Sequence, residues 1–403
     1  MRRLLMIAAL AASMGQPAHA ENAPVKIGVL TDMNGPIGYL TGEGSVEAAR
    51  LAVEDMHGHV LGRPVQILSA DHQNKPDVGS LIARQWYDSG VDVVLDVPNS
   101  AVALAVAAVA KNAHKLTLIS GAATDALTEE SCNDHTLQWG LDSYSEASAV
   151  VPLIEHGAKT FYLEVADYAF GHTQEKAARA KIAQLGAEVI GSVSFPADTD
   201  DYSSFLLRAQ ASHADVVELL LSGGQTLVNA FKQAKEFGLT QGGQRVATLH
   251  VYINDVHTLG LDKLAGLQFL VSSYWDTDEE TRAFAKRFYA RRGHMPSEIQ
   301  AAVYSTTYEY LKAVQAAGTT DADKVLAQLR SMPIDDMYSR HGKLLANGRL
   351  IHDMYLVEIK TPEESKHRWD YFKILQVVPG EKAFRPLAES KCPLLVKPGG
   401  KTQ

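Results

Sequence analysis

Residues 91–100 read VDVVLDVPNS, and together with KLTLIS at residues 115–120 they decide the fold. The first run is rich in β-branched residues and stops at a Pro-Asn pair, which predicts a short buried strand ending in a turn. Residues 101–113 are mostly Ala, Val and Leu, which predicts a largely buried helix. A second strand and a second loop of small residues at 121–124 follow. The stretch therefore predicts two neighbouring strand-to-helix loops at the carboxyl edge of a parallel sheet, where ligands bind in open α/β folds.

Each of these two loops carries a hydroxyl group, on Ser100 and on Thr124. A hydroxyl beside the backbone N–H groups of a helix start suits an anion such as a carboxylate. The alternative is structural: Ser100 is then only the N-cap of its helix, and Thr124 only a turn residue.

The same alternation of strands and helices extends through both halves of the chain, with a lapse after Thr128 and a restart near residue 143. It predicts a doubly wound parallel half-sheet in each half, and so an α/β chain of two lobes. The predicted strands are 25–30, 65–69, 91–97 and 115–120 in the first half, and 159–165, 188–194, 216–221 and 246–251 in the second.

The amino terminus predicts export. Two arginines precede an apolar run, and Ala18-His19-Ala20 is a small-x-small cleavage site. We interpret residues 1–20 as a signal peptide cleaved after Ala20, which directs the protein to the periplasm. The apolar run is too short for a permanent membrane anchor.

Composition excludes some partners. The chain has 38 Lys and Arg against 47 Asp and Glu, which gives a formal net charge of −9. An acidic chain without basic clusters is a poor binder of nucleic acid or anionic membranes. Its length favours two domains. In an oxidising compartment the two cysteines, Cys132 and Cys392, are expected to form a disulfide.

Enzymatic motifs are not found in the sequence. It lacks a Gly-x-Ser-x-Gly elbow, a His-Glu-x-x-His motif, a P-loop and a Cys-x-x-Cys pair. Asp71-His72 is an acid–base candidate, although a loop-shaping role near the cleft is the stronger interpretation. We therefore expect a binding protein without catalytic residues, cofactor or metal.

Several short motifs, in their order and spacing, resemble the type I periplasmic solute-binding proteins of ABC transporters, in the branched-chain amino-acid-binding branch. They are Thr31-Asp32-Met33-Asn34-Gly35-Pro36, residues 61–65 (LGRPV), Asn99-Ser100, Ala122-Ala123-Thr124, residues 140–143 (GLDS), residues 167–171 (DYAFG) and Lys232-Gln233-Ala234.

The resemblance implies two lobes joined by three crossover strands, near residues 140–144, 272–276 and 347–352. Lobe one would comprise residues 25–141 plus 275–347, and lobe two residues 142–274 plus 348–403 with a C-terminal tail. It also implies a monomer that closes on a small ligand and delivers it to a membrane permease, without inserting into the membrane itself.

Carried over by position, Ser100, Ala122 and Thr124 would cradle a ligand carboxylate, and Phe170 and Tyr39 would stand near aromatic positions of the family. One feature of amino-acid-binding relatives is missing: a lobe-two carboxylate for the ligand ammonium. Asp255 falls several residues later than the expected position.

The missing lobe-two carboxylate favours a ligand that is a carboxylic acid without an α-amino group. The best hypothesis for the ligand is an aromatic acid, for the reason that follows. Further candidate wall residues are aromatic: Tyr168, Tyr252, Tyr274, Trp275 and Tyr304. Some of these rings are alternatively core or hinge packing. An amino acid or an amide is the alternative ligand, and a sensor that presents its solute to a receptor is the alternative function.

Overall fold

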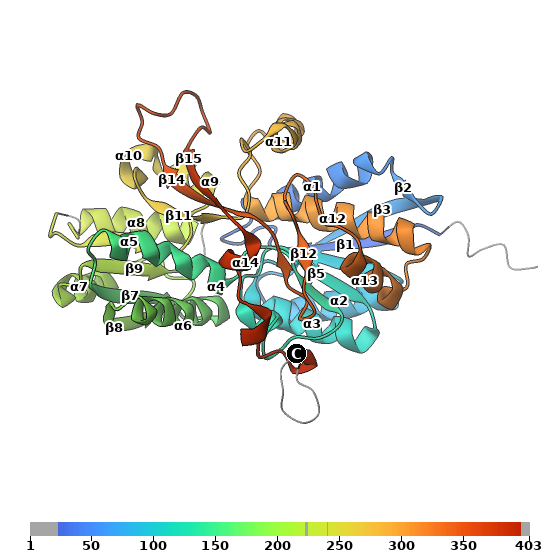
Figure 1. The fold of residues 1–403 in the computed structure, drawn as a ribbon, viewed down its shortest axis with the longest axis horizontal. Coiled ribbons are helices and arrows are strands. Elements are labelled where there is room, and N and C mark those ends of the chain that lie inside the picture. Colours follow the sequence, from blue (N-terminus) through green and yellow to red (C-terminus); the bar gives the residue numbers. More distant parts are fainter. Residues whose placement is uncertain (1–22, 222–224, 240, 396–403) are drawn as a thin grey trace, which may run out of the picture.

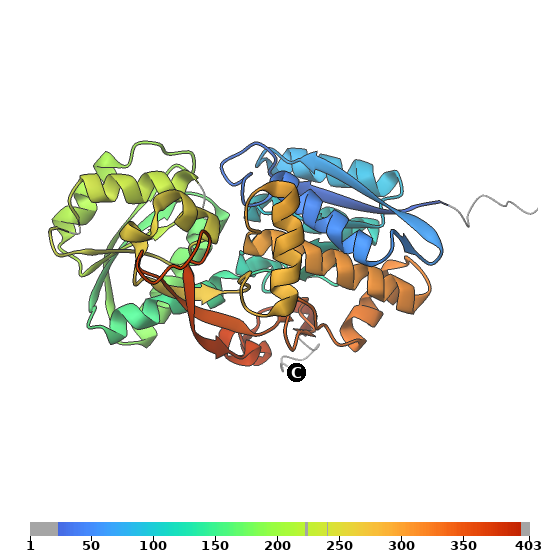
Figure 2. The ribbon, with the colours of Figure 1, turned by 90° about the horizontal axis from the view of Figure 1, so that it is seen from above.

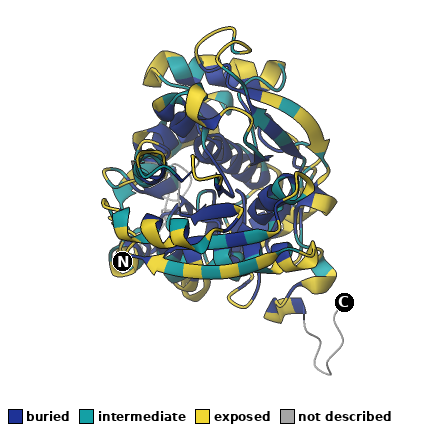
Figure 3. Ribbon diagram, turned by 90° about the vertical axis from the view of Figure 1, so that its left-hand side faces the viewer, coloured by how far each residue is buried: buried dark blue, intermediate teal, exposed yellow. Residues whose placement is uncertain are grey.

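The computed structural model describes residues 23–221, 225–239 and 241–395, so the predicted signal peptide lies outside the described residues. Two lobes lie side by side and are connected by strands that run between them (Figures 1 and 2). Buried strands occupy the middle of the layers, and the exposed residues concentrate on the outer elements (Figure 3). No helix in the described part of the chain is long and apolar enough to cross a membrane.

Lobe one is built on a six-stranded sheet with the order β2-β3-β1-β4-β5-β6. Every neighbouring pair is parallel except β2 with β3. Helices cover both faces: α1 packs with α12 on one side, and α2 with α3 on the other. The strands are β1 (Val25–Thr31), β2 (His59–Val60), β3 (Arg63–Asp71), β4 (Val93–Asp96), β5 (Leu116–Ile119) and β6 (Thr136–Gln138). The helices are α1 (Gly42–Asp55), α2 (Pro76–Asp88), α3 (Ser100–Ala113), α11 (Glu279–Arg292), α12 (Glu298–Ala317) and α13 (Ala322–Ser331).

Lobe two holds a four-stranded parallel sheet, β10-β9-β7-β8, and a three-stranded antiparallel sheet, β11-β14-β15. One continuous apolar core joins the two sheets. The strands are β7 (Thr160–Ala166), β8 (Glu188–Phe195), β9 (Val216–Leu220), β10 (Arg245–Thr248), β11 (Gln268–Val271), β14 (Met354–Ile359) and β15 (Phe372–Val378). The helices are α4 (Ser143–Glu146), α5 (Val150–Glu155), α6 (Ala169–Gln184), α7 (Ser203–Ser212), α8 (Gln225–Glu236), α9 (Ile253–Leu259) and α10 (Leu261–Leu264).

Three connections join the lobes, as the predicted fold class requires. They are residues 139–142 before α4, residues 272–278 before α11, and residues 352–353 between β13 (Leu350–Ile351) and β14. β13 pairs only with β12 (Lys343–Leu344) in a small hairpin of lobe one. The bounds of the lobes given above stay a prediction.

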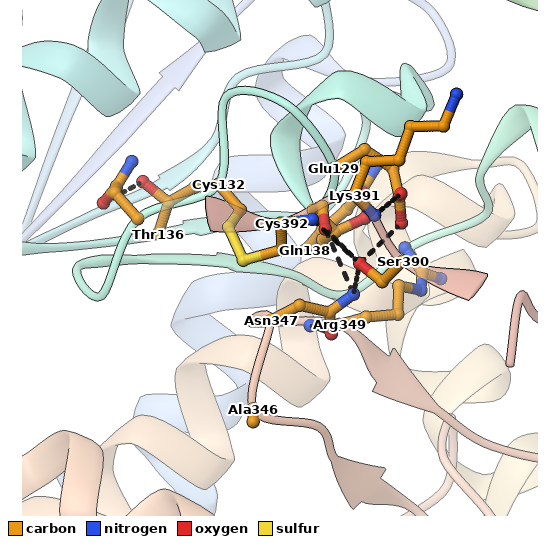
Figure 4. Close-up of a disulfide and its surroundings, with 12 residues drawn as sticks. Glu129, Cys132, Thr136, Gln138, Ala346, Asn347, Arg349, Ser390, Lys391 and Cys392 are labelled. Carbon is orange, nitrogen blue, oxygen red and sulfur yellow. Dashed lines mark hydrogen bonds between the residues drawn. A yellow bond between two sulfur atoms is a disulfide. The ribbon is translucent and has the colours of Figure 1, made fainter. Parts of the chain in front are cut away.

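The C-terminal tail returns from lobe two to lobe one. A disulfide joins Cys132 to Cys392, with the two Cα atoms 5.5 Å apart. Around it, Ser390 Oγ donates to Glu129 Oε1 over 3.0 Å, and Asn347 Nδ2 donates to Ser390 Oγ over 3.3 Å (Figure 4). The tail assigned to lobe two therefore also covers lobe one.

Two glutamates lie inside the parallel sheet of lobe two. Glu164 on β7 and Glu218 on β9 are fully buried, and none of their carboxyl oxygens has a hydrogen-bond partner among the described residues. Burial raises the pKa of each carboxyl group to about 8.

Candidate functional site

A cavity of roughly 590 Å³ lies between the lobes. Lobe one contributes the loops that follow β1, β3, β4 and β5, and lobe two the loops that follow β7, β8, β9 and β10. The carboxyl ends of both parallel sheets therefore face each other across it, as expected for ligand sites in α/β folds. The lining residues are Asn34, Gly35, Pro36, Ile37, Leu40, Asp71, Gln73, Asn74, Pro98, Asn99, Ser100, Ala101, Gly121, Ala123, Ala166, Tyr168, Phe170, Ala197, Asp198, Leu221, Thr226, Tyr252 and Ile299.

The two loops predicted from residues 91–124 do lie against each other. A Cβ atom on Gly121 would come within 2.7 Å of Pro98 Cβ, so a side chain there would push the loops apart. Glycine at this position is thus required by close packing.

Ser100 lines the cavity at the start of α3. The turn before it is strained, with positive φ at Asp96 (78°) and Val97 (50°), a conformation that non-glycine residues rarely adopt. Asn99 is the N-cap, because its side chain accepts from the backbone N–H groups of Ala101 and Val102 over 3.0 and 3.1 Å. The alternative that Ser100 is only an N-cap is therefore wrong.

The other two residues of the predicted cradle do not line the cavity. Ala122 is buried, and its carbonyl accepts from Gln138 Nε2 over 2.9 Å. Thr124 Oγ1 accepts from Ala126 N over 3.4 Å and lies 3.1 Å from the hydroxyl of Thr173 on α6. Ala123, between them, lines the cavity instead.

Three of the predicted aromatic rings do line the cavity. Tyr168 and Phe170 flank the start of α6, with ring centroids 5.9 Å apart in an edge-to-face arrangement. Tyr252 precedes α9. All three belong to lobe two, so this lobe supplies the aromatic wall, opposite Ser100 and Ile299 of lobe one.

The other four predicted rings are not among the lining residues. Trp275 Nε1 donates to the carbonyl of Trp369 over 2.9 Å, and Tyr274 packs edge-on against Trp275, so both fix the second crossover. Tyr304 OH donates to Asp55 Oδ2 over 2.7 Å within lobe one. Tyr39 OH instead donates to Asp255 of lobe two. Aromatic residues near a crossover satisfy the same sequence pattern as cavity walls, since both places bury apolar surface.

Asp71 and His72 shape the polar loop after β3. Asp71 Oδ1 accepts from Gln73 N over 2.7 Å, and His72 Nδ1 accepts from Asn74 N over 3.0 Å. Burial lowers the pKa of His72 to about 4, so its imidazole is neutral at neutral pH. These contacts agree with the loop-shaping interpretation of the pair.

Several lining residues escaped the sequence analysis. Ile299 lies on α12, about two hundred positions from the loop it faces, and no local pattern signals this contact. Asn99 and Asn74 were visible as turn residues, and the structure joins them by a 3.3 Å hydrogen bond. The described lining residues include two acids, Asp71 and Asp198, and no lysine or arginine, so a bound carboxylate would depend on hydroxyl and N–H donors.

Comparisons with known proteins agree with this geometry. Residues 24–366 match the family model described as periplasmic binding protein. A periplasmic binding protein of Burkholderia mallei superposes with a TM-score of 0.90 at 44% sequence identity, covering 92% of this chain and 99% of that one.

Two further solved structures are similar. A branched chain amino acid ABC transporter periplasmic ligand-binding protein of Burkholderia xenovorans LB400 is 43% identical, with a TM-score of 0.81, over 92% of this chain and 99% of that one. An ABC transporter solute binding protein of R. palustris, solved in complex with 4-hydroxybenzoate, has a TM-score of 0.80 at 20% identity, over 90% and 98% of the two chains. At that identity the last similarity concerns the fold alone.

Proposed function

Because the chain belongs to the periplasmic binding protein family, whose members bind solutes for ABC transporters, we propose that it clasps a small carboxylate ligand between its lobes and delivers it to an importer. The cavity carries this proposal. It holds roughly 590 Å³, a volume that suits one small molecule, and both lobes line it. A ligand that contacts both lobes stabilises their closed arrangement, since it binds that arrangement better than an open one.

The aromatic wall supports an aromatic acid as the ligand. Tyr168, Phe170 and Tyr252 offer ring faces and edges to a planar ligand, and phenol groups can hydrogen-bond its substituents. Ser100 also lines the cavity, at the start of α3, and its hydroxyl can donate to a ligand carboxylate. The fold-level similarity to a protein that binds 4-hydroxybenzoate makes this compound the first to test.

An amino acid is the second candidate, and Asp198 favours it. This exposed acid lines the lobe-two side of the cavity and offers a carboxylate to a ligand ammonium group. The Burkholderia xenovorans relative is described as part of a branched chain amino acid transporter, which points the same way.

We also propose that residues 1–20 are removed after Ala20, and that a membrane permease is the partner of the folded protein. A sensor that presents its solute to a receptor would use the same cavity. Co-purification with the permease would support the importer, and capture of a receptor alone would support the sensor.

A thermal-shift panel on ligand-stripped protein tests the ligand class. A ligand at one hundred times its dissociation constant stabilises the folded state by about 2.7 kcal/mol. We expect 4-hydroxybenzoate and related aromatic acids to raise the melting temperature. Shifts with leucine or valine and none with aromatic acids would overturn this assignment in favour of the amino acid.

A further inference from the structure

The segment of lobe two that leads into α9 contacts lobe one at several points besides the cavity, and two of these contacts involve ionisable side chains of the segment. Tyr252 of this segment lines the cavity. His250 lies two residues before it, and Asp255 three residues after it, in the first turn of α9. Asp255 accepts a hydrogen bond from a residue of lobe one, and His250 forms an ion pair with another.

The first contact joins Tyr39 to Asp255. Tyr39, in the loop after β1, donates its phenol hydrogen to Asp255 Oδ1. Asp255 is fully buried, and its other oxygen accepts from the backbone N–H of Tyr252 over 3.2 Å. A single carboxylate therefore holds both a residue of lobe one and the backbone of a cavity wall.

The second contact joins His250 to Glu298, the first residue of α12. His250 Nε2 lies 3.1 Å from Glu298 Oε1, and His250 Nδ1 lies 3.3 Å from the carbonyl oxygen of Leu270. Both ring nitrogens thus face acceptors, which fits the doubly protonated imidazolium. The second oxygen of Glu298 accepts from the backbone N–H and the hydroxyl of Ser272, over 2.5 and 2.6 Å, at the second crossover.

The environment of His250 agrees with a charged ring. Burial alone would lower its pKa, but the charge and hydrogen bond of Glu298, together with the charge of Glu146, raise the pKa to about 9. The ring also packs edge-on against Tyr252, with centroids 4.5 Å apart.

We propose that these two pairs, Tyr39–Asp255 and His250–Glu298, form an interlobe clasp that positions Tyr252 and holds the lobes in the binding-competent arrangement. The clasp rests on the proposed function in that it tunes ligand binding. Both pairs consist of protein atoms only, so they favour this arrangement of the lobes in the free protein too. The measured dissociation constant equals the intrinsic constant divided by the fraction of molecules in the binding-competent arrangement. Loss of the clasp lowers this fraction and therefore raises the measured dissociation constant.

Small-angle scattering of the free protein and titration with 4-hydroxybenzoate test the clasp. We would compare wild type with Tyr39→Phe, Asp255→Asn and the double variant. Tyr304→Phe is the matched control, because it removes the same type of phenol–carboxylate bond, to Asp55, within lobe one. His250→Gln tests the second pair independently.

We expect Tyr39→Phe, Asp255→Asn and His250→Gln each to enlarge the radius of gyration of the free protein, and saturating 4-hydroxybenzoate to restore it. Affinity should fall by about three- to tenfold, and the double variant should lose no more than Asp255→Asn alone, because the Asp255 carboxylate is the acceptor of the Tyr39 bond. Tyr304→Phe should change neither quantity.

Free variants that scatter like wild type would overturn the clasp, and so would affinity losses in Tyr304→Phe equal to those in Tyr39→Phe. A clasp effect on scattering, in a protein that binds no aromatic acid, would support the clasp and reject the proposed ligand class instead.

Discussion

Replacing Ser100 with alanine tests whether the start of α3 binds the ligand or only builds the fold. Ser100 is buried and lines the cavity, whereas Asn99 provides the cap of the helix. Removal of the Ser100 hydroxyl therefore leaves the capping bonds in place. We expect a loss of affinity without a matching loss of stability.

The size of the loss follows from the donors that remain. Asn99 already occupies the N–H groups of Ala101 and Val102, and no lysine or arginine stands among the described lining residues. The hydroxyl then supplies one hydrogen bond to a charged group, which contributes about 1.5–3 kcal/mol. Its loss raises the dissociation constant by about ten- to a hundredfold.

Isothermal titration of 4-hydroxybenzoate measures this effect, and thermal unfolding of the free protein measures stability. Asp321→Ala is the control for a lost helix cap: Asp321 Oδ1 accepts from Lys324 N over 3.1 Å at the start of α13, away from the cavity. That variant should lose about 0.5–2 kcal/mol of stability and keep its affinity. A Ser100→Ala protein that behaves like Asp321→Ala would refute the reasoning.

Three further variants probe other features of the structure. Phe170→Ala removes one ring of the aromatic wall. It should lower the affinity for aromatic acids by at least about tenfold, and the affinity for small solutes of the size of serine much less, which competition binding would measure. Equal losses of affinity for both kinds of solute would reject a stacking role. Cys132→Ser removes a disulfide that spans 260 residues, and on the loop-entropy model it should lower the free energy of unfolding by up to about 5 kcal/mol. Free thiols titrated in the denatured, unreduced wild-type protein would contradict the disulfide. Burial raises the pKa of the Glu218 carboxyl group to about 8 in the folded state, whereas the unfolded side chain releases its proton near pH 4.5. The stability that the bound proton contributes is therefore lost as the pH rises between these values, by at most about 1.4 kcal/mol per pH unit. Glu218→Gln should therefore flatten the decline in stability between about pH 5 and about pH 8 in denaturant titrations, and a decline as steep as in wild type would show that Glu218 does not cause it.

Local patterns predicted the sheets and the edge at which the cavity lies. The β-branched run ending at residue 97 and the small-residue helix after it are β4 and α3, and their loop lines the cavity as expected. These features follow from periodicity and turn chemistry, which act over a few neighbouring residues. Several short elements were missed. β2, β6, α9, α10 and β11 each span between two and seven residues, too few to show a clear period, and β6 also lies in the stretch where the pattern lapses.

Long-range packing decided which of the predicted residues meet. Of the seven aromatic candidates, Tyr168, Phe170 and Tyr252 line the cavity, whereas Tyr274 and Trp275 pack at a crossover. The sequence shows only that all of them are large apolar side chains, which are usually buried. It does not distinguish a ring buried in a cavity wall from a ring buried at a crossover, because the neighbouring residues look alike in both cases.

Hydrogen bonds between the lobes could not be predicted from the sequence. Asp255 stands a few residues from where a ligand-binding acid was expected, and only the fold brings Tyr39, more than two hundred residues earlier, against its carboxylate. Local sequence patterns predicted the strands, the main helices and the sheet edge that holds the site, because these features depend mainly on residues close together in the chain. Whether a given side chain contacts the cavity, the crossover or the opposite lobe follows instead from packing between distant parts of the chain, because it depends on how the two sheets face each other.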